Sequence, residues 1–197
     1  MVELTHLSYS SISRYLNCGK SWQFKYQQNL PEKKSSSLIF GSAFHLTIQK
    51  HIQGGSDLRQ SWRESWSKEL VLTPDIDWDT DNATKIFNYG VQVFSNEDVL
   101  NMLKNLKPLM QNGSPCMEVE VSLNVPGVPV PIIGFIDLIQ DSMVPVDFKT
   151  SGRSWAQQQA DKELQATFYL AAMNQAGLVQ LAAKFEYIVL AKNKTTK

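Results

Sequence analysis

Three charged residues, Asp137, Asp147 and Lys149, stand in otherwise apolar sequence. Residues 131–139 and 144–150 are typical of two strands, and the intervening residues supply the turn of a hairpin. With a loop at residues 141–143, position 137 falls opposite position 147. Residues that are opposite each other, or two apart in one strand, share a face of the sheet. The two carboxylates and the amine are therefore predicted to converge.

Two carboxylates in apolar surroundings lose hydration and repel each other unless a cation joins them. Their oxygens suit a hard ion such as Mg²⁺ or Mn²⁺, held by few protein ligands together with water and substrate phosphate. Lys149 could orient a water molecule beside that ion, or offset charge on a pentavalent phosphorus. The alternative is a structural ion pair between aspartate and lysine, and the hairpin sequence leaves both interpretations open.

A histidine, His45, lies in a predicted helix over residues 38–53. It shares a face with Gly41, Ile48 and Ile52, so its imidazole projects from a mostly apolar stripe. By spacing alone, a histidine in such a stripe is more often a core residue than a metal ligand.

Basic side chains are interleaved with aromatic residues near the N-terminus, where residues 9–28 are predicted to form two short helices. Arg14, Lys20 and Lys25 could pair with phosphates while the aromatic rings stack on bases. The alternative, which we favour for the aromatic residues, is a helical hairpin that packs them inward. A further lysine-rich segment occupies residues 192–197.

The composition is that of an ordinary globular chain. Its 197 residues are 43% hydrophobic and 19% charged, with a formal net charge of zero, so no global charge signals a nucleic-acid partner. No apolar run reaches the roughly 18 residues that cross a bilayer, and the N-terminus lacks the pattern of a signal peptide. These features predict a cytoplasmic protein without a membrane partner.

The predicted elements follow the order helix, three strands, helix, strand. Their ranges are 38–53, 117–125, 131–139, 144–150, 154–176 and 184–191. Residues 56–112 are predicted to be a helical insertion with an acidic loop at 73–81. In the first strand, either Glu118 or Glu120 could face the hairpin acids, or both could lie on a solvated face. The long helix is predicted to begin with a capping box at Ser154, and it places Gln165 and Tyr169 side by side.

At this point the chain resembles the PD-(D/E)XK nuclease superfamily, specifically its RecB/AddB-type exonuclease branch. The resemblance covers nearly the whole chain and depends on five features in the right order. They are Gly41-x-x-x-His45, Gly134-x-x-Asp137, Asp147-Phe148-Lys149-Thr150, Gln165-x-x-x-Tyr169, and an opening Ser10-Ser11-Ile12 … Leu16-Asn17-Cys18 segment. Two departures are an isoleucine, Ile136, where the superfamily name has proline, and Asp-x-Lys in place of Glu-x-Lys.

The resemblance implies an α/β fold with a restriction-endonuclease-like core, αβββαβ, whose mixed central sheet is flanked by helices. It also implies a single nuclease domain over residues 1–197, with a helical N-terminal region and the insertion at about 56–112.

The resemblance further implies roles for individual residues. Lys149 would position or activate the water, and Gln165 and Tyr169 would brace both the site and the DNA strand. The ligands of a Mg²⁺ or Mn²⁺ ion would be His45, Asp137, Asp147 and the backbone carbonyl of Phe148.

Some relatives in this branch, including the CRISPR adaptation nucleases, hold an iron–sulfur cluster with one early cysteine and three near the C-terminus. Cys18 matches the early position, and the only other cysteine is Cys116. No iron–sulfur cluster is therefore expected in this chain.

The expected function is that of a metal-dependent DNA nuclease, an exonuclease acting in repair, recombination or phage replication. DNA is the expected partner, and a helicase or recombination protein could supply the strand. One alternative is a structure- or site-specific endonuclease on the same core. Another is a non-catalytic DNA-binding or partner-docking module with a degenerate core, against which the intact set of Asp137, Asp147 and Lys149 argues.

Overall fold

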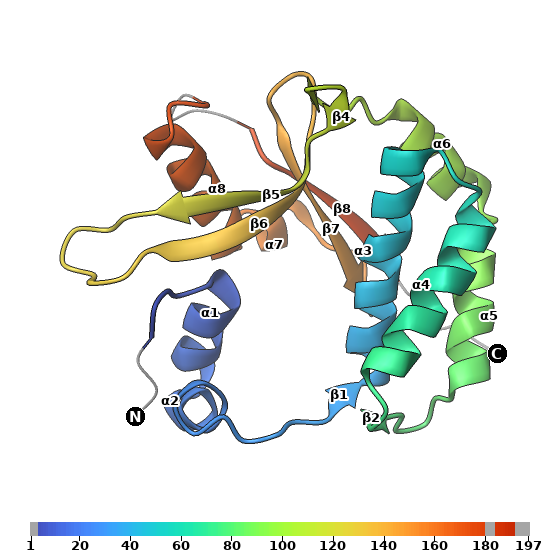
Figure 1. The fold of residues 1–197 in the computed structure, drawn as a ribbon, viewed down its shortest axis with the longest axis horizontal. Coiled ribbons are helices and arrows are strands. Elements are labelled where there is room, and N and C mark those ends of the chain that lie inside the picture. Colours follow the sequence, from blue (N-terminus) through green and yellow to red (C-terminus); the bar gives the residue numbers. More distant parts are fainter. Residues whose placement is uncertain (1–3, 180–183, 192–197) are drawn as a thin grey trace. The chain divides into compact units, whose positions relative to one another are not determined.

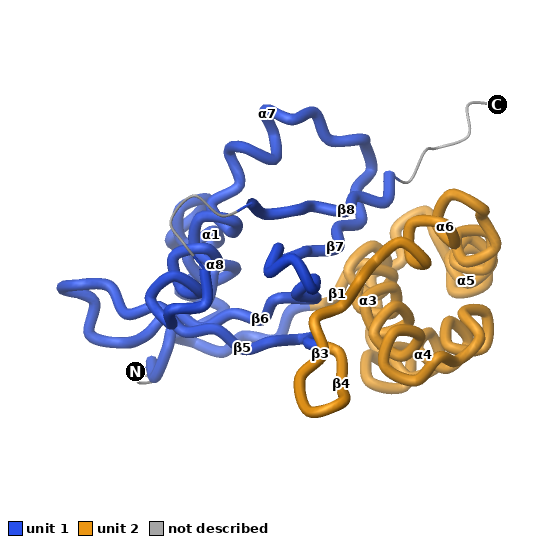
Figure 2. The backbone as a smooth tube through the Cα atoms, turned by 90° about the horizontal axis from the view of Figure 1, so that it is seen from above, with its two compact units in different colours: residues 1–32, 116–197 blue, residues 33–115 orange. Residues whose placement is uncertain are grey.

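A computed structural model describes residues 4–179 and 184–191 of the chain. The chain forms two compact units, which we call unit 1 (residues 1–32 and 116–197) and unit 2 (residues 33–115) (Figure 2). The lysine-rich segment 192–197 lies outside the described residues. Across the described part of the chain, no helix is both long enough and apolar enough to traverse a bilayer.

Unit 1 is built on a four-stranded mixed sheet with the strand order β5-β6-β7-β8 (Figure 1). The strands are β5 Met117–Leu123, β6 Ile132–Ile139, β7 Pro145–Ser151 and β8 Glu186–Ala191. The β5–β6 and β6–β7 pairs are antiparallel, whereas β7 and β8 are parallel. Strand β6 is almost continuously apolar, and its second half and the first half of β7 are buried because both faces of the sheet are covered there. Ile136, Leu138 and Val146 are fully buried.

The hairpin that joins β6 to β7 has the register expected from the sequence. Leu138 pairs with Val146 and Ile139 with Pro145. Met143, with a φ of 64°, occupies the left-handed position that closes a three-residue hairpin loop. The pairing between β6 and β7 begins at the turn and reaches Leu138, and Figure 1 shows the two strands diverging away from the turn.

Short helices surround the sheet of unit 1. They are α1 Tyr9–Asn17, α2 Gly19–Trp22, the π-helix η1 Gln23–Gln27, α7 Gln157–Ala160 and α8 Leu164–Gln175. The segment before α1 is attached to the sheet by a parallel bridge between Leu7 and Ile132. The ring edges of Phe168 and Tyr169 on α8 lie so close to Gly134 of β6 that an added Cβ there would be 2.6 and 2.7 Å from them. The glycine therefore permits the close approach of helix and strand.

The prediction of one continuous helix over residues 154–176 is wrong in its first third. Ser154 caps no helix, because α7 begins after Ala156 without a side-chain cap, and α8 begins only after Glu163. The Tyr187 hydroxyl instead accepts the N–H of Ala166 at 3.1 Å, which satisfies one of the unpaired donors in the first turn of α8. A partner distant in sequence thus replaces the predicted local cap.

Unit 2 is mainly helical. Its elements are β1 Lys34–Ser35, α3 Ser36–Gly54, α4 Leu58–Leu72, β2 Ile76–Asp77, α5 Ala83–Val93, α6 Glu97–Asn105, β3 Met110–Gln111 and β4 Ser114–Pro115. The helix predicted over 38–53 is confirmed as α3. Helix α6 begins at Glu97 because the Asn96 side chain accepts the N–H groups of Asp98 and Val99 and so caps it.

Aromatic residues form the core of unit 2. Trp62 is fully buried, lies 5.6 Å from Phe40 between ring centroids, and donates its indole N–H to the Phe87 carbonyl at 3.0 Å. Gly90 of α5 lies against the Trp62 ring, where even one added methyl group would overlap it. Trp62 of α4 therefore has a packing role.

Candidate active site

Asp147 is a nearly buried carboxylate at the centre of unit 1, with only 2% of its surface exposed. Its Oδ1 accepts a hydrogen bond from Gln165 Nε2 at 2.9 Å, and its Oδ2 lies 2.8 Å from Lys149 Nζ. A buried carboxylate is costly unless it is paired and hydrogen-bonded. Here the helix α8 and the strand β7 each supply one partner.

Gln165 links the acid to the amine through the two ends of its amide. Its Oε1 accepts from Lys149 Nζ at 2.7 Å, while its Nε2 donates to Asp147 and also to the Tyr169 hydroxyl at 3.1 Å. This orientation follows from the partners, because a reversed amide would turn its N–H groups toward an ammonium and its oxygen toward a carboxylate. The amide therefore holds the ammonium and the carboxylate of β7 together.

Tyr169 anchors this chain of hydrogen bonds to the sheet. Its hydroxyl donates to the backbone carbonyl of Phe135 at 2.6 Å. Burial raises the pKa of Tyr169 to about 12, and the charges of Asp147 and Asp137 raise it as well. The phenol is therefore protonated, and able to donate, throughout the physiological range.

Asp137 reaches the same segment of β7 through the backbone. It is 8% exposed, and its Oδ2 accepts the N–H of Phe148 at 2.6 Å. If the hairpin register continued by one pair, Asp137 would lie opposite Asp147. The Asp137 carboxylate satisfies the Phe148 N–H, a donor that the neighbouring strand would otherwise satisfy. Hydrogen bonds and an ion pair thus connect all five predicted catalytic residues around residues 147–149 of β7.

Glu118 is the second acid beside Asp137, and the sequence left the choice between it and Glu120 open. The ladder pairs Glu120 with Phe135 but omits position 118. Glu118 has a φ of 50°, a strained conformation of the kind that is common at functional sites. Carboxylate oxygens of Glu118 and Asp137 lie within 4.8 Å of each other. The two acids form a candidate metal-binding pair.

His45 lies on α3 in unit 2. Its half-buried ring packs against that of Phe44, with 6.2 Å between the centroids. Its role as a metal ligand stays a prediction, as does that of the backbone carbonyl of Phe148.

The basic residues predicted to bind nucleic acid gather in unit 1, where Arg14, Lys20 and Lys25 line one pocket. The alternative, in which aromatic residues pack within the helical hairpin, fits Trp22. Its ring lies edge-on to that of Tyr15, with 5.6 Å between the centroids, and its indole N–H donates to Ser11 Oγ at 2.9 Å.

The two cysteines have different surroundings. Cys18 Sγ accepts the N–H of Ser21 at 3.4 Å and so caps α2. Cys116 is buried.

Comparison with known proteins decides the family. The model of the PD-(D/E)XK nuclease superfamily matches residues 6–197. The chain belongs to this superfamily. It is therefore a nuclease-type hydrolase, a phosphodiesterase by class, with the restriction-endonuclease-like α/β fold expected from the order of its elements.

Among solved structures, the nuclease is similar to a proposed exonuclease from Eubacterium rectale. The TM-score is 0.60 at 12% sequence identity, and the likeness covers 95% of this chain and 67% of the other. At this identity the likeness supports the fold. No curated protein matches the chain.

Proposed function

We propose that this nuclease is a metal-dependent deoxyribonuclease of the RecB/AddB type, an exonuclease acting on DNA ends in the cytoplasm during repair, recombination or phage replication. Residues 1–197 would act as one nuclease domain with a helical insertion at about 56–112. A helicase or recombination protein could deliver the strand. The observation that carries the proposal is the bonded set of Asp147, Lys149 and Gln165.

The acids present fit a divalent ion. The carboxylates of Glu118 and Asp137, whose oxygens lie within 4.8 Å of each other, repel each other, and a hard cation between them removes that cost. We propose Asp137 and Asp147 as ligands of Mg²⁺ or Mn²⁺, with the Phe148 carbonyl, His45 and Glu118 completing the shell. When bound, such an ion lowers the pKa of a coordinated water and polarises a phosphoryl oxygen.

The remaining residues would orient the reactants. Lys149, with its ammonium held between Asp147 and Gln165, would position the attacking water and offset charge on the phosphate. That water would attack phosphorus in line while the bond to the 3′ oxygen breaks. The attacking water gives up a proton to solvent and the departing oxygen takes one from solvent, which leaves a 5′-phosphate and a 3′-hydroxyl. Tyr169 would maintain this arrangement by holding Gln165 against the sheet.

A cleavage assay on linear and closed circular DNA tests the proposal, with Mg²⁺, with Mn²⁺ and with a chelator. Asp147→Asn keeps the shape of the side chain but removes its charge, and Lys149→Gln removes the ammonium. Each variant is expected to lower the cleavage rate by about a hundredfold or more. The control is Lys162→Gln, which changes an exposed lysine and is expected to keep full activity.

Full activity in folded Asp147→Asn or Lys149→Gln would contradict the assignment. Cutting of the closed circle would make the protein an endonuclease. DNA binding without cleavage under every metal condition would make it a non-catalytic module.

A further inference from the structure

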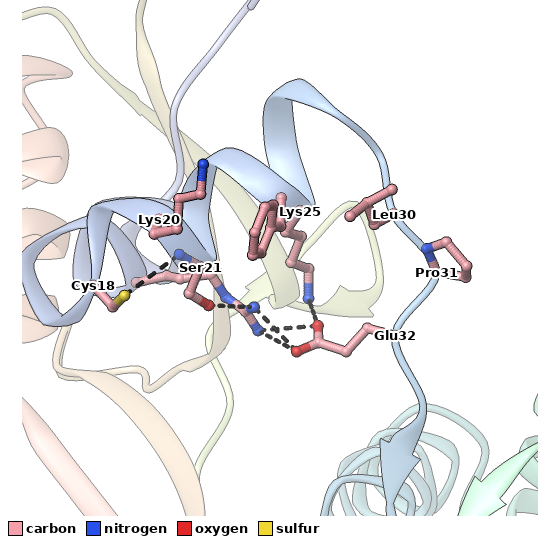
Figure 3. A pocket seen from close by; sticks show the side chains of 9 residues that line it. Cys18, Lys20, Ser21, Lys25, Leu30, Pro31 and Glu32 are labelled. Atoms are coloured by element: carbon pink, nitrogen blue, oxygen red, sulfur yellow. Dashed lines mark hydrogen bonds and ion pairs between the residues drawn. The ribbon is translucent and has the colours of Figure 1, made fainter.

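A pocket of about 390 Å³ is formed entirely by residues 14–32, the stretch that ends the first segment of unit 1 (Figure 3). Three cationic side chains line it, Arg14, Lys20 and Lys25, against a single carboxylate, Glu32. The whole chain has a formal net charge of zero, so this excess of positive charge is local. A cavity with such a lining favours an anionic ligand.

The carboxylate of Glu32 accepts hydrogen bonds from two of these cations, Arg14 and Lys25. Arg14 Nη1 and Nη2 both donate to Oε1 at 3.1 Å, and Nη2 also donates to Oε2 at 3.1 Å. Lys25 Nζ donates to Oε2 at 3.0 Å. Figure 3 shows Lys25 reaching this group. The hydrogen bonds from Arg14 and then Lys25 lower the pKa of Glu32, which keeps it ionised.

Glu32 is also open to exchange. Its side chain is 49% exposed. Water therefore screens its ion pairs with Arg14 and Lys25, and these pairs are weak. The Arg14 guanidinium is held from a second side as well, because Nη1 donates to Ser21 Oγ at 3.2 Å. The guanidinium would therefore keep its place if the carboxylate left.

An aromatic ring lies beside the cations. Phe24 is 40% exposed, and Lys20 Nζ lies 5.0 Å from the centre of its ring. Both Phe24 and Lys25 belong to the π-helix η1, a conformation that is rare and frequent at functional sites. An exposed ring next to cations is the arrangement on which a nucleobase stacks.

We propose that this pocket binds a phosphate group of a nucleic-acid strand, which takes the place of the Glu32 carboxylate on Arg14 and Lys25, while a base stacks on Phe24. A phosphodiester offers the same two-oxygen edge to a guanidinium, and a terminal phosphate carries one further acceptor oxygen. Glu32 thus occupies the phosphate position on these two cations until the strand arrives. The inference depends on the proposed function only in taking DNA as that strand.

Binding measured without metal tests this inference separately from catalysis. A short single-stranded oligonucleotide with a fluorophore at one end is titrated with the full chain in chelator, and fluorescence anisotropy is followed across a range of salt concentrations. Arg14→Gln is expected to weaken binding about tenfold and to reduce the salt slope by about 1. Glu32→Gln is expected to tighten binding about threefold, because the competing charge is gone.

The double variant distinguishes exchange from a general charge effect. Glu32→Gln should bring no gain when Arg14→Gln is already present, because the gain requires the guanidinium. Arg14→Lys keeps the charge but loses the two-pronged edge, and it should give an intermediate affinity. The control Lys162→Gln should bind like the wild-type chain.

Strands with a 5′-phosphate, a 3′-phosphate or hydroxyl ends identify the source of the phosphate. If the pocket binds a terminal phosphate, Glu32→Gln should tighten binding only of the strand that carries that phosphate. If it binds an internal phosphodiester, Glu32→Gln should tighten binding of all the strands equally. Weaker binding by folded Glu32→Gln, or unchanged binding by both single variants, would overturn the inference. Failure of the proposed function would instead appear as absent cleavage with binding retained.

Discussion

At the scale of single residues, each polar side chain of the active site is oriented by a partner from another element. Gln165 of α8 holds Asp147 and Lys149 of β7, and Tyr169 ties Gln165 to the backbone of β6. Geometry of this kind matters because a catalytic group that is displaced by about 1 Å can lose a hundredfold in rate.

Replacing Tyr169 with Phe tests the anchor. The loss of its hydrogen bonds to Gln165 and Phe135 is expected to lower the free energy of unfolding by about 1 kcal/mol at neutral pH. The cleavage rate should fall, because Gln165 is no longer held against the sheet. Urea unfolding and a cleavage assay measure the two effects. An unchanged rate would show that the anchor is dispensable.

Tyr169→Phe is also expected to change how the free energy of unfolding depends on pH. The pKa of Tyr169 rises on folding from 10.0 to about 12, so the folded chain holds this proton more tightly. The resulting stability is fully present below pH 10 and is lost as the pH rises toward 12. Wild-type stability should therefore fall more steeply in this window than that of Tyr169→Phe, as urea unfolding across that range would show. Parallel profiles would contradict the assignment.

Sequence reasoning placed Asp137, Asp147 and Lys149 on one hairpin because the register depends on local turn chemistry. It did not decide between Glu118 and Glu120, since strand alternation gives both residues the same face. The positive φ at Glu118 removes that residue from the ladder, and no pattern of residue types signals such a local distortion. The bonds of Gln165 were equally invisible, because they depend on how α8 lies against the sheet.

At the scale of elements, the contact between α8 and β6 brings together the two halves of the site. It depends on Gly134, because the rings of Phe168 and Tyr169 occupy the space of a side chain. Both rings are nearly buried and have little room to move, so the glycine has a packing role.

Gly134→Ala is expected to lower the free energy of unfolding by about 1–3 kcal/mol, since the added methyl group must displace buried rings. Cleavage should fall with it, because Tyr169 holds Gln165. The matched control is Gly152→Ala, where an added Cβ meets no atom within 4 Å. Urea unfolding of both variants gives the comparison, and equal stabilities would show that α8 adjusts freely.

Helix boundaries were less predictable than strand pairing for a physical reason. The capping box at Ser154 is a local signal of modest strength, and bonds between distant residues compete with it. The Tyr187 hydroxyl accepts an N–H in the first turn of α8. The Tyr9 hydroxyl donates at 2.9 Å to Glu163, the residue just before α8 begins. Both contacts join segments that are far apart in sequence.

At the scale of the whole molecule, the chain builds unit 1 from two segments and unit 2 from the residues between them. The order of helices and strands was readable from hydrophobic periodicity. The extent of unit 2 was not. Phe40 and Phe44 of α3 pack with Trp62 and Phe94, and this tertiary contact makes α3 part of the same unit as the predicted insertion.

Metal should stabilise the folded chain if His45 of unit 2 shares an ion with the acids of unit 1. At a hundredfold excess over its Kd, a ligand adds about 2.7 kcal/mol to the free energy of unfolding. Mn²⁺ should therefore raise the Tm of the wild-type chain, and His45→Ala should reduce that rise. Thermal unfolding with and without Mn²⁺ provides the measurement.

The control for this comparison is His51→Ala, on the same helix. The His51 ring bonds to the Ser56 carbonyl at 2.8 Å, so this variant should lower the Tm but keep the full response to Mn²⁺. A wild-type response in His45→Ala would exclude the histidine from the metal shell.

The place of Glu32 in the chain has a mechanical consequence. Glu32 is the last residue of the first segment of unit 1, and Lys33 begins unit 2. Arg14 and Lys25 pair with the Glu32 carboxylate, so the end of this segment is tied back to residues within the segment. An incoming strand that displaced the carboxylate would therefore change the contacts of the residue at which the backbone passes from unit 1 into unit 2.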